Sequence, residues 1–532
     1  MSESTQHKIS RVRSPRVQIT YDVETGGALE KKEIPFIVGI LAPLAAKSEK
    51  VLPPVRDRKL VNVDRDNFNK YMESVEPRVA FEVPRTLPNG DSTMMVDIKF
   101  THIDDFDPVA VVGQVADLAA LYGSRSRLRD FLGKLDGNDG LTKILVSVLG
   151  DAEKVSALQA VVETAKEGLV AAQSLEDVNE RAEAVLTAFS EDGRSEGSDI
   201  HDMLTKGKMV LEDGQIPYAL ELIAEFVEQV VIDNDLLSQS GDDINLGALL
   251  TRRVSQKDKL MSRQLNYILH HDDFQEIEAS WRGLHYLVMN TETNSRLKLK
   301  VLNVSFDDLY KDLDKAVEFD QSGLFKMIYE EEYGTYGGEP YSLLIGDYQL
   351  GRTARDANFL EKISNVAAAA HAPFISSAYA KLFDMEDFDS LHKPRDLSKI
   401  FESAELIKWR SFRESEDSRY VSLTLPKVMM RLPYHHENNP VEGIYFDEDV
   451  AVNLFKLDEN GELERDSAGN PVPSTVMDED GIDFESTQKQ IDARKVLWGN
   501  PSYILAQRIT NAFSLYGWTA AIRGVEGGGL VQ

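Results

Sequence analysis

The stretch RVQITYDVETGGALEKKEIPFIVGI, residues 16–40, contains two strand patterns of different kinds. In its first eight residues apolar and polar side chains alternate, which predicts a strand with one buried face. The residues of this predicted strand are Arg16, Val17, Gln18, Ile19, Thr20, Tyr21, Asp22 and Val23. The sequence ETGG at 24–27 then interrupts the pattern. The apolar run from Ile34 to Ala42 predicts a second strand that is buried on both faces.

Further strands and then helices are predicted beyond this stretch. Residues 79–83 and 94–100 both alternate apolar and polar side chains, as half-buried strands do. The dipeptide Asp107-Pro108 predicts the start of a helix, because proline is favoured in the first helical turn. Apolar residues recur at helical spacing after it. The chain therefore opens with strands followed by helices.

The later part of the chain mixes both kinds of pattern. Helical spacing of apolar residues predicts helices over residues 220–230 and 265–288, the second with Asp272 as its N-cap. Alternation predicts strands over residues 297–301 and 421–425. We therefore expect an α/β (α+β) fold, in which mixed sheets are covered by packed helices.

The composition is that of an acidic globular protein without cysteine. The 532 residues are enough for two or more domains, each with its own core. A formal net charge of -30 argues against nucleic-acid binding, which needs Lys and Arg to neutralise phosphates. The absence of cysteine excludes disulfides, thiolate catalysis and Cys-ligated zinc. Because no signal-peptide core or membrane-length apolar run occurs, we expect a cytoplasmic protein with no membrane insertion.

The distribution of polar residues predicts four segments. Residues 1–15 are polar and basic and predict a flexible arm. Residues 16–189, here called the N-terminal part, and residues 216–532, the C-terminal part, are the expected folded units. Residues 190–215 contain the sequence SEDGRSEGS and are expected to form a linker and junction. The acidic stretch 447–492 is expected to be an exposed insertion, because it cannot bury enough apolar surface to order itself.

Two histidine pairs could suggest a metal site. His270 and His271 precede two aspartates, but adjacent residues on a helix point about 100° apart and cannot face one ion together. A helix boundary is the preferred interpretation there. His435 and His436 lie near Glu437 in a predicted loop, and an ordinary loop is again preferred. No metal ligand is therefore expected.

Other motifs of catalysis or cofactor binding fail on inspection. Residues 136–140, DGNDG, begin like a calcium loop, but Ser147 stands where that loop needs its bidentate Glu. The glycine-rich stretches 333–338 and 524–529 lack the residues of a phosphate loop. The charged cluster at 410–419 could be an acid–base site, yet no nucleophile accompanies it, and an ion-pair network or interaction surface is preferred. No catalytic residue and no cofactor are expected.

Longer motifs resemble two known families. Residues 16–40 and the sequence KLDGND at 134–139 resemble the small sheath subunit of the bacterial type VI secretion system, the TssB/VipA family. The sequences NYILHHDDFQEIEASWRGLHYLV at 266–288, AAAAHAPFISSA at 367–378 and GWTAAIRGVEGGG at 517–529 resemble the large sheath subunit, the TssC/VipB family. The chain thus resembles a fusion of two sheath subunits. Large subunits continue well beyond the EGGG motif, so we expect their C-terminal region to be absent.

This resemblance implies a mechanical role. Members of these families share a contractile-sheath subunit fold of two interlocked halves and assemble into a helical sheath around an inner tube of Hcp. The sheath grows extended on a baseplate, contracts to drive the tube outwards, and is recycled by a ClpV-type AAA+ ATPase. Contraction itself needs no nucleotide, because the work is stored in a bistable lattice. An enzyme using the 410–419 cluster and a non-contractile scaffold are the alternative functions.

Two sites follow from the same resemblance. The strand Arg16–Val23 is expected to pair with a neighbouring subunit, because a polar arm precedes it and a glycine hinge follows it. Ile200, Met203 and Leu204 follow the linker, where the ATPase would find its recognition helix. A helix packed on its own domain is the alternative interpretation there. Finally, we expect the helices of the N-terminal part to pack on the C-terminal part across an apolar interface.

Overall fold

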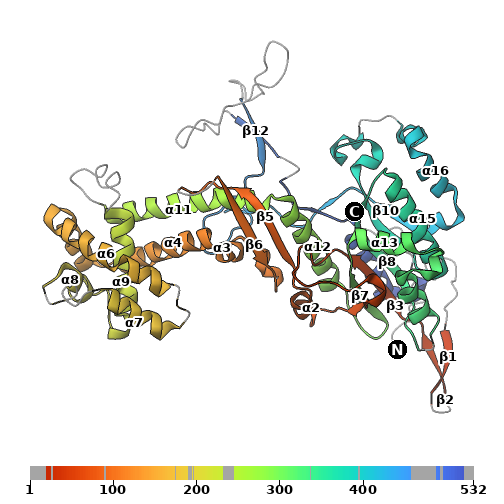
Figure 1. The fold of residues 1–532 in the computed structure, drawn as a ribbon, viewed down its shortest axis with the longest axis horizontal. Coiled ribbons are helices and arrows are strands. Elements are labelled where there is room, and N and C mark those ends of the chain that lie inside the picture. Colours follow the sequence, from red (N-terminus) through yellow and green to blue (C-terminus); the bar gives the residue numbers. More distant parts are fainter. Residues whose placement is uncertain are drawn as a thin grey trace, which may run out of the picture.

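The structure is a computed structural model that describes residues 20–25, 28–88, 92–173, 175, 177–189, 195, 197–231, 245–335, 337–392, 396–456, 487–491 and 495–520. The protein is elongated, with a sheet lobe at one end and a helical bundle at the other (Figure 1). Two long helices, α4 (Ala116–Leu135) and α11 (Leu246–Leu269), run side by side between them. The predicted arm 1–15, residues 190–194 of the linker and residues 457–486 of the acidic insertion lie outside the described residues.

The sheet lobe is built on six strands in the order β10-β9-β8-β3-β7-β4. These strands are β3 (Phe36–Ala42), β4 (Val61–Asn62), β7 (Leu297–Asn303), β8 (Tyr341–Leu350), β9 (Phe374–Ala378) and β10 (Val421–Thr424). Neighbouring strands are parallel except for β4, which is antiparallel to β7. Along the chain, the parallel strands have the order 2-1-3-4-5 of a doubly wound α/β sheet. The predicted α/β fold is confirmed.

Helices cover both faces of this sheet and create two cores. They are α12 (Asp272–Met289), α13 (Phe306–Lys315), α14 (Gly323–Phe325), α15 (Ala354–Ala369), α16 (Ile407–Glu414) and α17 (Ser502–Tyr516). Alternate residues of β3 face opposite ways, because side chains alternate along a strand. Val38 and Ile40 join the core that contains residues of α12 and α17, whereas Ile37 and Leu41 join the core with α13 and α15. The apolar run at 34–42 is thus a strand buried on both faces, as predicted.

Four two-stranded ladders complete the strands. They are β1 (Thr20–Thr25) with β2 (Ala28–Glu33), β5 (Arg78–Pro84) with β6 (Thr93–Lys99), β11 (Val428–Met429) with β14 (Trp498–Gly499), and β12 (Ala451–Lys456) with β13 (Thr487–Ile491), all antiparallel. The alternation at 94–100 predicted the buried face of β6 correctly, since Met94, Val96 and Ile98 are all buried. The hairpin β5–β6 lies across α11 and α12 and shares their core.

The helical bundle joins elements from both sides of the linker. Its helices are α3 (Pro108–Gln114), α5 (Asp139–Leu149), α6 (Ala152–Gln173), α7 (Val178–Ala188), α8 (Asp199–Thr205) and α9 (Ile216–Phe226), and α2 (Phe68–Val75) lies at the sheet lobe. α3 begins at Pro108, as the sequence predicts. Among the described residues, no helix is long and apolar enough to cross a membrane.

The helix predicted over residues 265–288 is in fact two helices. α11 ends at Leu269 and α12 begins at Asp272. The N-cap of α12 is His271, whose Nδ1 accepts the N–H of Asp273 at 3.2 Å, so Asp272 is the first helical residue and not the cap. His271 holds this position because its ring stacks on Phe81 of β5, with ring centroids 3.9 Å apart. The helix boundary predicted at His270 and His271 is confirmed.

Candidate assembly interface

A strand of the N-terminal part lies in the middle of the sheet of the C-terminal part. β3 pairs with β7 from Phe36 to Ala42 and with β8 on its other side. The pairing extends past both ends, because Phe36 N donates to Arg296 O at 2.7 Å and Val304 N donates to Ala42 O at 2.9 Å. All seven residues of β3 are buried. Removing this strand would break two ladders and open both cores, so the two parts form one folding unit.

Two tryptophans of the C-terminal part hold the ends of this strand. Trp518 donates its indole N–H to Ile34 O at 2.7 Å, just before β3 begins. Trp281 donates its indole N–H to Leu44 O at 3.0 Å, just after β3 ends. Trp281 is fully buried, and Trp518 also packs against Phe36. Each indole satisfies a carbonyl that the sheet leaves free, which fixes where the strand enters and leaves.

The hairpin β5–β6 is read by one buried side chain of α11. The amide of Gln264 donates to Pro84 O at 3.0 Å, and its oxygen accepts the N–H of Thr86 at 2.8 Å. Gln264 is fully buried. Because a buried amide without partners is costly, this contact fixes the hairpin in one register on α11.

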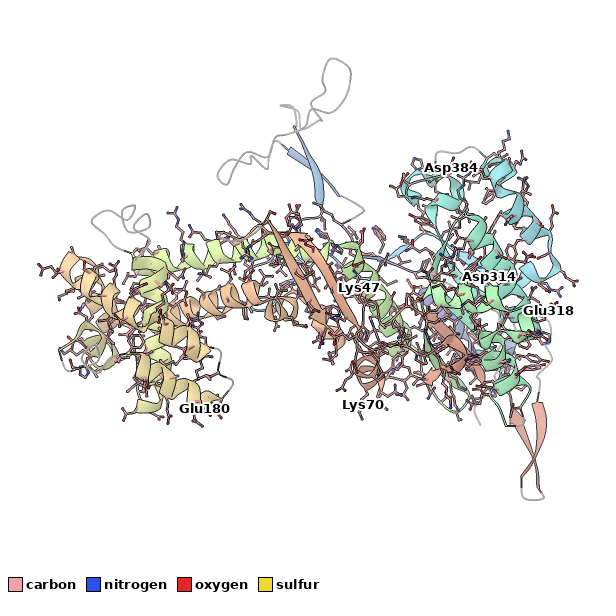
Figure 2. The ribbon with its side chains drawn as sticks, viewed as in Figure 1. Lys47, Lys70, Glu180, Asp314, Glu318 and Asp384 are labelled. Atoms are coloured by element: carbon pink, nitrogen blue, oxygen red, sulfur yellow. The ribbon has the colours of Figure 1, made fainter. Side chains whose placement is uncertain are left out.

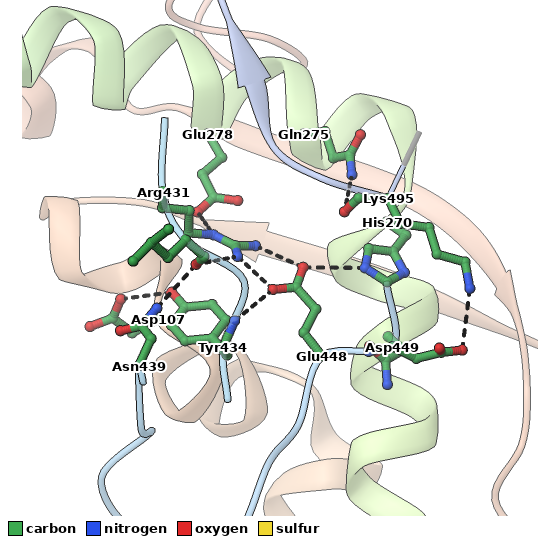
Figure 3. A network of polar contacts seen from close by, with 12 residues as sticks. Asp107, His270, Gln275, Glu278, Arg431, Tyr434, Asn439, Glu448, Asp449 and Lys495 are labelled. Carbon is green, nitrogen blue, oxygen red and sulfur yellow. Dashed lines mark hydrogen bonds and ion pairs between the residues drawn. The ribbon is translucent and has the colours of Figure 1, made fainter. Parts of the chain in front are cut away.

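A buried network of charges closes the joint from the other side (Figure 3). Arg431 donates to Glu278 at 2.8 Å and to Glu448 at 2.6 Å. Glu448 also contacts His270 at 3.2 Å and accepts the N–H of Tyr434 at 3.0 Å. Burial alone would raise the pKa of Glu448, but the hydrogen bonds from His270 and Arg431 and the charge of Arg431 lower it to about 2. The carboxylate therefore stays ionised inside the protein.

This network reaches the N-terminal part through Tyr434. The Tyr434 hydroxyl donates to Asp107 Oδ1 at 3.2 Å, at the N-cap of α3. A little further on, Gly443 lies against Tyr122 of α4, and Arg125 donates to its carbonyl oxygen. Gly443 has a φ of 96°, a conformation that glycine adopts without strain. Residues 430–450 thus form a strap that fastens α3 and α4 to α11 and α12.

Comparison with known families identifies these parts. Residues 251–456 and 470–532, about half of the chain, match the family described as EvpB/VC_A0108, tail sheath N-terminal domain. Residues 9–163 match the family described as type VI secretion system, VipA, VC_A0107 or Hcp2. The chain belongs to the type VI secretion sheath proteins.

Two curated sheath proteins of Pseudomonas aeruginosa agree with this. The type VI secretion system sheath protein TssB1 is 40% identical over 155 residues, which cover 90% of TssB1 and 29% of this chain. The sheath protein TssC1 is 43% identical over 281 residues, which cover 52% of this chain. The chain spans about half the length of TssC1 (49%). The resemblance to a small and a large sheath subunit on one chain is confirmed.

The predicted inter-subunit strand of this sheath protein lies in a hairpin. Thr20–Thr25 pairs with Ala28–Glu33, a second strand that sequence reasoning missed because ALEKKE has no apolar alternation. Residues 16–19 lie outside the described residues. The hairpin projects from the sheet lobe (Figure 1), and no third strand of the described chain pairs with it. An isolated hairpin is marginal in water, so its free edges are suited to a further strand. Pairing with a neighbouring subunit stays a prediction.

The candidate ATPase-recognition residues face inwards. Ile200, Met203 and Leu204 on α8 are 2%, 0% and 7% exposed and belong to the core of the helical bundle. α8 is capped by Ser198, whose hydroxyl accepts the N–H of His201 at 3.1 Å. The structure therefore favours the alternative of a helix packed on its own domain. Recognition of these side chains by an ATPase would require α8 to leave the bundle, and it stays a prediction.

The charged cluster at 410–419 has structural partners. Arg410 donates to the carbonyl oxygens of Phe401 and Ser403 at 2.8 and 2.7 Å, so it ties α16 to the preceding turns. Arg419 pairs with Glu416 at 3.3 Å on the surface, where both side chains are exposed. The buried residues of α16 are apolar, Trp409 and Phe412. These contacts agree with the preferred interpretation of an ion-pair surface.

The histidine pairs are separated by the fold. His270 contacts Glu448, whereas His271 stacks on Phe81, so the two do not face one ion, as predicted. His435, His436 and Asp447 do come within 4.8 Å of one another. However, the two imidazoles stack face to face with centroids 4.4 Å apart, and Asp447 accepts the N–H of His436 at 2.8 Å. Stacked rings point their nitrogens in similar directions, whereas metal ligands must converge.

Proposed function

We propose that this chain is a structural subunit of a type VI secretion contractile sheath in which the small and the large sheath parts are one polypeptide. The observation that carries the proposal is the position of β3, a strand of the TssB-like part, between two strands of the TssC-like part. Such a shared sheet makes the pair a rigid unit. A contractile lattice needs rigid units joined by compliant links.

The proposed links are strand additions. A hairpin with free edges can pair with strands of adjacent subunits, and such backbone ladders persist while the connecting segment hinges. In the proposed assembly the subunits polymerise around an Hcp tube, start from a baseplate and contract to propel the tube. A ClpV-type AAA+ ATPase would then recycle the contracted form, and the location would be the bacterial cytoplasm. The chain would not act as an enzyme, because the sheath families it matches are structural.

Negative-stain electron microscopy of the purified chain tests this proposal. Tubular polymers with a helical repeat are expected, and added Hcp is expected to increase their number and fill their lumen. Two tube diameters would show an extended and a contracted lattice, whereas a single diameter under all conditions would favour a non-contractile scaffold. Uniform monomers at concentrations where Hcp itself forms tubes would contradict the sheath function. A nucleotide-hydrolysis assay on the same sample should give no turnover.

A further inference from the structure

Buried arginines of the N-terminal part meet carboxylates of the C-terminal part in the helical region. Arg125 Nε lies 2.8 Å from Asp258 Oδ1, and these side chains are 8% and 6% exposed. Arg127 on the same helix α4 lies 2.7 Å from Glu225 of α9. Arg181 of α7 lies 2.7 Å from Glu221, also on α9. Each of these contacts is direct and largely removed from water.

These contacts share one polarity. In every one of the three, the cation precedes the linker and the carboxylate follows it. The sheet lobe repeats the pattern, because Arg58 lies 2.8 Å from Asp308. The longer contact between Arg282 and Asp107, at 3.5 Å, runs the other way. Most of the net charge of -30 also lies after the linker. We call the set Arg58–Asp308, Arg125–Asp258, Arg127–Glu225 and Arg181–Glu221 the polar seam.

The physical effect of such a seam is on choice more than on strength. A buried ion pair is often no more stabilising than an apolar pair of the same volume, because both charges lose their hydration. A buried charge whose partner is missing is strongly unfavourable. Two N-terminal parts placed face to face would bury guanidinium groups against one another, and two C-terminal parts would bury carboxylates. The apolar cores by themselves would not penalise these wrong pairings.

We infer that the polar seam specifies the partner: a TssB-like part accepts a TssC-like part, whether from its own chain or from another copy, and rejects its own kind. The inference rests on the proposed function only in supposing that parts of different copies meet during assembly. The partner chemistry is a helical surface with carboxylates at the positions of Glu221, Glu225 and Asp258. Fusion keeps the correct partner at hand, and the seam excludes the others.

A cleavable chain tests this directly. A protease site placed within residues 190–194 allows the folded protein to be cut into two parts that remain associated. A second chain carries the exchanged pair Arg125→Asp and Asp258→Arg. After both are cut and mixed, native mass spectrometry measures which N-terminal part binds which C-terminal part. Matched combinations are expected to dominate mismatched ones by about a hundredfold, the cost of a buried unpaired charge.

Two control chains separate choice from strength. Exchanging the charges of Lys47 and Asp273, a pair that is 54% and 36% exposed, is expected to change the sorting by less than about fivefold. Lys47 lies on the outer surface in Figure 2. The apolar pair Arg125→Met with Asp258→Leu is expected to associate normally. An unchanged N-terminal part should bind the Asp258→Leu part at least tenfold more weakly than the Arg125→Met part does.

The apolar chain keeps the test decisive if the charge-exchanged chain does not fold. Mismatched parts that bind as tightly as matched ones would overturn the inference. Because the assay reads single pairs and needs no polymer, a sample that sorts its parts but forms no tubes would contradict the sheath function and leave the inference standing.

Discussion

Trp518 donates its indole N–H to the carbonyl oxygen of Ile34 at 2.7 Å, although 484 residues separate the two in the chain. The contact lies where the β1–β2 hairpin joins β3, so a force on the hairpin reaches the sheet at this point. Trp281 makes the corresponding contact with Leu44 at the other end of β3. A strand of the TssB-like part is thus held at both ends by the TssC-like part.

Replacing Trp518 by Phe should weaken this attachment with little loss of packing. The carbonyl of Ile34 would lose its partner, so the free energy of unfolding should fall by about 1–3 kcal/mol. Chemical denaturation measures this value, and hydrogen exchange should show faster exchange of the Phe36 amide. Trp498→Phe is the control, because that ring is 36% exposed, and it should change stability by less than about 0.5 kcal/mol. Equal effects of the two substitutions would contradict the role of Trp518.

Cutting the linker within residues 190–194 should leave the two parts bound. β3 remains between β7 and β8, and the cores that contain it draw side chains from both parts. A sizing column at micromolar concentration should give one peak with the mass of the whole chain. Two peaks would show that the shared sheet forms only while the parts are covalently joined.

Deleting residues 1–33 should remove polymers and spare the fold. The hairpin within this segment pairs only with itself in the described chain, whereas Ile34 and β3 are retained. The melting temperature is expected to change by less than about 2 °C. Electron microscopy of the same sample should show no tubes. Normal tubes from the deletion variant would mean that lattice contacts do not use this hairpin.

Met203→Asp should destabilise the helical bundle. Met203 is fully buried among apolar residues, and a carboxylate there would have to be desolvated or protonated. A loss of about 3 kcal/mol or more is expected, together with faster proteolysis of α8. Substituting the exposed Lys206 by Ala at the end of the same helix is the control and should be nearly neutral. A soluble, fully stable Met203→Asp protein would show that α8 readily leaves the bundle, as an ATPase-recognition helix must.

Acid should loosen the joint through Glu448. Its pKa is lowered from 4.5 to about 2 in the folded protein, so its contribution is present above pH 4.5 and is lost as the pH falls towards 2. The shift corresponds to roughly 3 kcal/mol. Glu448→Gln should therefore lower stability at pH 7 and flatten the decline between pH 4.5 and 2. Parallel stability curves for the two proteins would contradict this account.

Much of the local structure followed from the sequence because local rules apply to it. Apolar runs and alternation predicted β3, β5 and β6, and Asp107-Pro108 predicted the start of α3. The break at His270 and His271 was expected from residue spacing, but its cap was not. His271 caps α12 because Phe81, far away in the sequence, holds its ring in place. The second hairpin strand was missed since its charged residues give no periodic signal.

The sequence by itself determined that residues 36–42 would be a strand without a polar face, because seven consecutive residues carry no charge. It also carried the family motifs of both sheath subunits. Only the tertiary structure decided that this strand lies between β7 and β8, that two tryptophans hold its ends, and that Arg125 meets Asp258. The physical reason is that burial is a property of one residue and its neighbours in the chain. Strand order and charge partners depend on which distant segments pack together.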